Sequence, residues 1–139
     1  SVSSPSIVSA NDCTYSSESQ SAEVPITMTV DPSYTVTIPA AIVIPDETQT
    51  VEATVSAANV VIDPEKQLEV AIGETFSVTQ SGDELAGTVL PYGTVLEVPA
   101  GTATGSATLV FTVSGSPKYA GDYTGTVTFT ISVVEQTTP

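Results

Sequence analysis

One stretch near the C-terminal end constrains the fold most strongly. Residues 123–133 read Y-T-G-T-V-T-F-T-I-S-V, so glycine or an apolar or aromatic residue alternates with Thr or Ser throughout. Side chains on a strand alternate between its two faces, so this pattern predicts a strand with one buried face and one hydroxyl-bearing outer face. Its length of eleven residues exceeds that of a typical strand. We therefore expect it to cross the whole domain.

Shorter stretches of the same kind recur along the chain, separated by turn residues. We expect strands within residues 22–30, 34–38, 48–56, 58–62, 67–72, 75–80, 85–90, 94–98 and 106–113, and a strand or a bend between sheets at 40–44. Turn signals such as Asp31-Pro32-Ser33 separate these stretches, and no helical periodicity is present. About eight to ten short strands with regular turns predict an all-β fold, and a β-sandwich rather than a barrel.

The 139 residues are long enough for one domain with its own core. Residues 1–21 are rich in Ser and poor in apolar side chains, which is typical of a linker or a loosely held N-terminal arm. We place the sandwich at 22–134 and a C-terminal tail or linker at 135–139. The single cysteine, Cys13, has no internal partner, and we interpret it as a buried or tolerated thiol, with an intermolecular bridge as the alternative.

The charge of the chain excludes several partners. The chain has sixteen acidic residues and only two basic ones, Lys66 and Lys118, which gives a net charge of −14. Phosphate recognition needs clustered Lys and Arg, so we predict no nucleic-acid partner. No run of about 20 apolar residues is present, so we also predict no membrane insertion in this segment. Ser and Thr replace charges on the surface, which favours an extracellular or cell-wall location.

The residue types exclude most catalytic arrangements. The chain has no His, and its only basic residues are two Lys, so neither a Ser-His-Asp nor a Cys-His arrangement can form. Paired carboxylates such as Asp46-Glu47 and Asp83-Glu84 lie in turn-like contexts, and sequence neighbours on a strand point apart. A glycosidase needs two carboxylates that face each other across a sugar. We predict that the chain is not an enzyme.

We expect no cofactor. The alternative is a bound calcium ion, because calcium takes oxygen ligands from loops and several acidic residues lie at turns. These residues are Asp31, Asp63, Glu65, Asp83, Glu84 and Asp122. None of them belongs to a D-x-D-x-D loop, and we interpret them as solvated turn residues.

Two tyrosines are the candidate ligand-binding residues. Tyr92 and Tyr119 lie in expected loops, where exposed rings can stack on a sugar. The alternative is that both rings pack over the ends of the sandwich. By their place in the alternating pattern, Tyr34 and Tyr123 are predicted to lie in the core.

Two segments carry a resemblance to a known class of domain. Residues 119–130, Y-A-G-D-Y-T-G-T-V-T-F-T, are similar to the closing strand of immunoglobulin-type sandwiches in bacterial surface and pilin-like proteins. Residues 34–40, Y-T-V-T-I-P-A, look like an early strand of small exported domains from Gram-positive bacteria. The resemblance implies an immunoglobulin-like Greek-key sandwich that serves surface display, adhesion or fibre building. It also implies that the Tyr123 hydroxyl reaches backbone, as in a tyrosine corner.

The leading interpretation is a non-catalytic structural or adhesive module of a secreted or cell-surface bacterial protein. Its partners would be other domains of a larger surface protein, or a host or extracellular protein or glycan. One alternative is a carbohydrate-binding module. Another is a pilus subunit that polymerises by strand addition, for which an N-terminal arm with Val2, Ile7 and Val8 has too few apolar residues.

Overall fold

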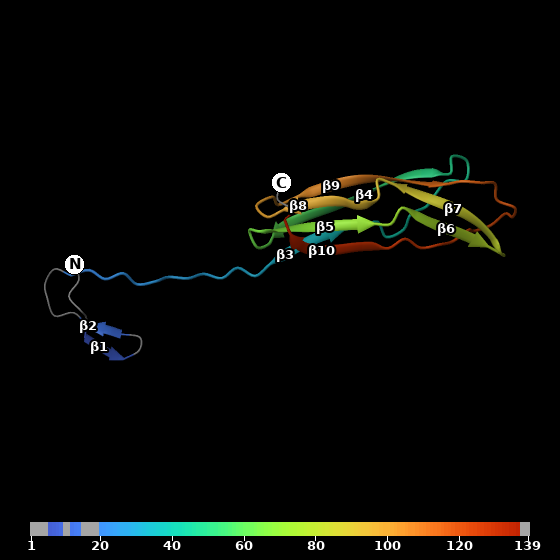
Figure 1. Ribbon diagram of the computed structural model, residues 1–139. Helices are drawn as coiled ribbons and strands as arrows, with labels where there is room; N and C mark the ends of the chain where they lie inside the picture. Colours follow the sequence, from blue (N-terminus) through green and yellow to red (C-terminus); the bar gives the residue numbers. More distant parts are fainter. Residues whose placement is uncertain (1–5, 10–11, 15–19, 137–139) are drawn as a thin grey trace. The chain divides into compact units, whose positions relative to one another are not determined.

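The structure is a computed structural model that describes residues 6–9, 12–14 and 20–136, with side chains described from residue 20 onward (Figure 1). The chain divides into two units, Ser1–Val30 and Asp31–Pro139. Each unit is described by itself.

The first unit contains one short hairpin. Strands β1 (Ser6–Ser9) and β2 (Asp12–Thr14) pair antiparallel, with Ile7 opposite Cys13. The side chain of Cys13 and most of the predicted Ser-rich arm lie outside the described residues.

The second unit is all-β, as predicted, and consists of two antiparallel sheets packed together (Figure 1). The five-stranded sheet has the order β3 (Ser33–Thr37), β4 (Thr50–Val61), β9 (Gly105–Val113), β7 (Asp83–Leu90) and β6 (Thr75–Gln80). The three-stranded sheet has the order β10 (Phe129–Glu135), β5 (Lys66–Ile72) and β8 (Gly93–Pro99). In the described part of the chain, no helix is long and apolar enough to cross a membrane.

The core lies between the two sheets and confirms the predicted alternation. On β5, Leu68 and Val70 are completely buried, and on β9 Leu109 and Phe111 are buried to within 1%. The rings of Phe76 on β6 and Phe111 lie 6.1 Å apart at a tilted angle that aromatic pairs favour. Other core side chains come from β4, β7 and β8.

A bulge joins two stretches that the sequence pattern separates. Residues 48–56 and 58–62 were expected as separate strands, but β4 runs through both. Asn59 has a φ of 54°, and the pairing of β3 with β4 shifts by one residue beside it. Burial consequently passes from Val55 and Ala57 to Val60, a step of three rather than two. The extra residue breaks the alternation without ending the strand.

The closing stretch is not one continuous strand, so the prediction for residues 123–133 was wrong in its extent. Thr124 first pairs with Thr79 of β6, through hydrogen bonds of 2.9 and 3.1 Å between their backbone N–H and C=O groups. The chain then leaves the five-stranded sheet and enters the other sheet as β10, whose Val133 lies opposite Leu68. Gly125 permits this passage, because a Cβ there would meet the carbonyl oxygen of Ser77.

Two other predicted strands are absent. Residues 22–30 form no ladder, although their apolar side chains alternate as expected. Residues 40–44, expected as a strand or a bend between sheets, form no strand and lie in the connection between β3 and β4, which are neighbours in the same sheet. Ile42 and Ile44 pack against the core, whereas Val43 is 78% exposed.

The start of the predicted C-terminal tail is held at the sheet edge. Glu135 is the last residue of β10, and its Oε1 lies 3.2 Å from Nζ of Lys66. The backbone N–H of Gln136 donates to the carbonyl oxygen of Glu65 at 2.7 Å. The sheet therefore extends into the first residues of 135–139, and residues 137–139 lie outside the described part.

Candidate functional site

Asp83 fastens the loop that precedes the closing stretch to the hairpin of β6 and β7. The hairpin turn is formed by Ser81 and Gly82, both at positive φ, as in a two-residue turn between twisted strands. Asp83, expected in this turn, is instead the first residue of β7. Its Oδ2 accepts a hydrogen bond of 2.6 Å from the Tyr123 hydroxyl and one of 2.9 Å from the backbone N–H of Lys118.

The Tyr123 hydroxyl also accepts a hydrogen bond of 3.1 Å from the backbone N–H of Tyr119. The hydroxyl therefore contacts backbone, as expected. Tyr123 was predicted to lie in the core, and in the structure it is half-buried. The loop between β9 and β10 and the hairpin of β6 and β7 therefore meet at one phenol and one carboxylate, which we call the Asp83–Tyr123 clamp.

The clamp shifts the titration of both its members. The hydrogen bond from Tyr123, and then that from the Lys118 N–H, hold the pKa of Asp83 below its ordinary value because both stabilise the carboxylate. Desolvation, followed by the hydrogen bond to Asp83, raises the pKa of Tyr123 because a phenolate there would face a carboxylate. At neutral pH the clamp thus consists of an ionised acid and a neutral phenol.

A cavity of about 870 Å³ adjoins the clamp. Its walls come from residues 38–46 and 117–127, and its floor includes Phe76, Val78 and Leu85 of β6 and β7. The volume lies in the range of small-molecule sites. The amide of Gln49, which also lines the cavity, already donates to the carbonyl oxygens of Val113 and Gly115 at 2.8 and 3.0 Å. The cavity therefore offers more apolar than polar surface, and the Gln49 amide is already engaged.

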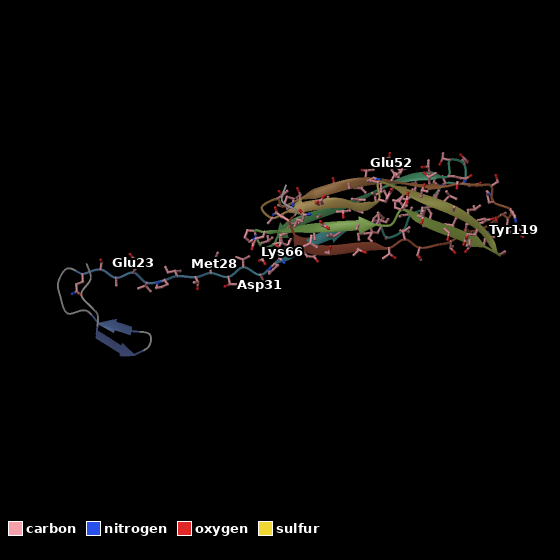
Figure 2. All side chains as sticks on the ribbon, in the orientation of Figure 1. Glu23, Met28, Asp31, Glu52, Lys66 and Tyr119 are labelled. Atoms are coloured by element: carbon pink, nitrogen blue, oxygen red, sulfur yellow. The ribbon has the colours of Figure 1, made fainter. Side chains whose placement is uncertain are left out.

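The structure does not bring the two predicted ligand-binding residues together. Tyr119 is 50% exposed, lines the cavity and lies near Asp83. Figure 2 labels it at one end of the sandwich. Tyr92 is also 50% exposed but follows the opposite end of β7, eight residues long, or about 25 Å at the usual rise of a strand. Ligand binding by either ring stays a prediction, but the two do not form one platform.

Tyr34 is the tyrosine whose predicted position was wrong. It was placed in the core by its alternation with Val36, yet it is 43% exposed. It lies at the start of β3, the edge strand of the five-stranded sheet, next to the shift in pairing with β4. At such an edge the inward face has no neighbour on one side.

The acidic residues do not gather into a metal centre. Among residues 20–136, no three Asp, Glu or Cys side chains are placed to hold one ion. Glu69 and Glu97 do lie opposite each other on β5 and β8. The Gln67 amide bridges them, with its nitrogen 2.6 Å from an oxygen of each. Calcium binding stays a prediction without an assigned set of ligands.

Sequence reasoning missed the role of Asp83, which looked like one turn acid among several. The local signal was its position directly after Ser81-Gly82, since a residue that follows a two-residue hairpin turn begins a strand. No local signal connects it to Tyr123, forty positions away. Comparison of this chain with models of protein families, and with curated proteins, finds no match.

Proposed function

We propose that this chain is a non-catalytic structural or adhesive module, immunoglobulin-like in fold, of a bacterial protein that is secreted or displayed on the cell surface. The observation that carries the proposal is the hydroxyl-rich outer face of β4 and β9. Thr50 and Thr112 lie opposite each other with their Oγ1 atoms 3.2 Å apart, and the Oγ1 atoms of Thr54 and Thr108 are 3.4 Å apart.

Such a face stabilises the sheet through paired β-branched side chains rather than through charge pairs. It presents hydroxyl groups where a cytosolic domain usually carries Lys, Arg, Asp and Glu in quantity. Together with the absence of His and Arg, this composition suits a module that spaces or holds other parts of a surface protein. Its partners would be neighbouring domains, or a host or extracellular protein or glycan.

Localisation tests this proposal directly. Antibodies raised against residues 31–139 should label intact cells of the source bacterium or its culture medium, and brief protease treatment of intact cells should remove the cell-bound signal. A cytosolic protein serves as the control for leakage. Labelling that appears only after lysis, in the cytosolic fraction, would contradict the proposal.

A carbohydrate-binding function is a second candidate, favoured by the cavity beside Tyr119. An exposed ring at the rim of an apolar cavity can stack against the C–H face of a sugar. In affinity electrophoresis through polysaccharide gels, retention should then be lost in Tyr119→Ala and kept in Tyr92→Ala, whose ring lies elsewhere. No retention of the unaltered chain, or equal retention of both variants, would exclude this site.

A further inference from the structure

Residues 22–30 form an apolar segment without a partner in the described structure. No strand is assigned between residues 20 and 32. Val24, Ile26, Met28 and Val30 are 77%, 93%, 87% and 61% exposed, respectively. Single exposed apolar side chains are ordinary, but four in alternating register along one extended stretch form an apolar face that a neighbouring strand could bury. Figure 2 labels Glu23 and Met28 on this stretch.

The outer edge of β10 is the surface that could accept such a segment. β10 pairs with β5 alone in its sheet, so one side of its backbone has no strand beside it in the described part of the chain. Ile131 and Val133 lie opposite Val70 and Leu68, and residues opposite each other in a ladder point to the same face. Val70 and Leu68 are completely buried, yet Ile131 and Val133 are still 37% and 36% exposed. The core is therefore uncovered along this edge.

The apolar segment matches that edge in length and pattern. The segment 22–30 has nine residues and β10 has seven, and both place an apolar side chain at every second position. In an extended chain, residues whose side chains share a face also direct their N–H and C=O groups to the same lateral side. In one of the two strand directions, Val24, Ile26 and Met28 thus offer both their side chains and their backbone groups to the acceptor.

Pro25 favours this one-sided arrangement. Proline has no N–H to donate, so it is tolerated on an edge strand whose unpaired side faces solvent. In the arrangement described, Pro25 lies on the side away from the acceptor, and no ladder hydrogen bond is lost. A further strand would find an incomplete set of donors on that outer side, which prevents lateral growth of the sheet.

We propose that residues 22–30 of one copy of this chain add as a strand to β10 of a second copy, which joins copies head to tail. The proposal rests on the structural role proposed above and names its partner. Because donor and acceptor are different surfaces, the contact is heterologous and repeats along a line rather than closing in a pair. Val2, Ile7 and Val8, the sparse apolar residues of the N-terminal arm, lie before this segment.

Charge permits the contact despite the net charge of −14. Glu23 is the one charged residue in the segment, and Glu135, already paired with Lys66 at 3.2 Å, is the one charged residue in β10. The remaining acids lie outside the contact and repel through solvent, where salt screens them. Association should therefore strengthen as the salt concentration rises.

Sedimentation velocity across a concentration series tests the assembly with the full 139-residue chain. We expect the average mass to rise with concentration and with added NaCl. Ile26→Glu should weaken association about 100-fold, because it places a charge against the apolar edge. Thr27→Glu is the matched control, since it adds the same charge on the opposite face, and it should change association by less than about threefold. A chain that stays monomeric throughout, or an equal effect of both variants, would overturn the proposal.

Disulfide trapping separates addition between copies from folding back within one chain. In a Cys13→Ser background, a chain with Met28→Cys is mixed with a chain with Ile131→Cys, and mild oxidation should yield the mixed dimer. Thr29→Cys in place of Met28→Cys should yield much less, because its side chain faces away. If only the doubly substituted chain links, and only to itself, the segment covers its own β10 and the proposal fails. Surface labelling of cells is unaffected by either result, so failure here differs from failure of the proposed localisation.

Discussion

Residues 22–30 and residues 123–133 carry nearly the same pattern and have opposite fates in the structure. Both alternate apolar and polar side chains. In the later stretch, Phe129 packs against the core and Val133 pairs with Leu68 of β5. In the earlier stretch, Ile26 is 93% exposed and pairs with nothing in the described structure. Alternation specifies which face of a strand is apolar, whereas the neighbouring chain decides whether a strand forms.

The largest effect should come from the packed member of this comparison. Phe129→Ala should lower the free energy of unfolding by about 3 kcal/mol, at the lower end for buried Phe because the ring is only half-buried. Urea denaturation followed by circular dichroism measures the change. Thr128→Ala, at an exposed neighbouring position, should cost less than about 0.5 kcal/mol. Equal losses for the two variants would show that Phe129 contributes no packing.

The passage between the two sheets comes next. Gly125→Ala should lower the free energy of unfolding by about 2 kcal/mol, since its methyl group would meet the Ser77 carbonyl oxygen on β6. Gly73→Ala is the matched control, because a Cβ there would have nothing within 4 Å. It should change stability by less than about 0.5 kcal/mol in the same denaturation experiment. If Gly125→Ala were as mild, the close approach to β6 would not exist in solution.

The clamp at the entry to the closing stretch should make stability depend on pH at both extremes. The pKa of Asp83 is lowered on folding, so its contribution is complete above the unfolded value of about 3.9 and is lost as pH falls through the folded value. The pKa of Tyr123 is raised on folding, so its contribution is complete below about pH 10 and is lost as pH rises through the folded value.

Tyr123→Phe should therefore flatten the melting temperature of the protein against pH at both ends. At the acid end the variant keeps only the Lys118 N–H as a donor to Asp83, and at the alkaline end it has no phenol to ionise. Tyr92→Phe, which alters an exposed ring remote from the clamp, should leave the profile as it was. Identical profiles for all three proteins would argue against the clamp.

The smallest effect is expected in the unpaired member of the comparison. Ile26→Ala, measured in dilute solution, should change the free energy of unfolding by less than about 0.5 kcal/mol, because the side chain is already exposed. The same substitution in concentrated solution should reduce stability if strand addition has occurred there, since binding stabilises the folded state. A large loss in dilute solution would mean that the segment packs within its own chain.

The sequence predicts what depends on local period and fails where distant residues decide. The all-β class and the burial of Leu68, Val70, Leu109 and Phe111 follow from alternation. The break at Asn59 conceals the continuity of β4, because a bulge changes the period without ending the strand. The Asp83–Tyr123 clamp and the transfer of the closing stretch between sheets join residues far apart along the chain. No local pattern encodes such pairings.

The pairing of β5 with β10 also determines when the three-stranded sheet can be completed during synthesis of the chain. Leu68 finds its partner in Val133, some 65 positions later along the chain. At a translation rate of 5–20 residues per second, Leu68 leaves the ribosome about 3 to 13 seconds before that partner exists. During this interval, β5 has only β8 to pair with, and the sandwich cannot close. The three-stranded sheet therefore stays incomplete until β10, its last strand in chain order, has been made.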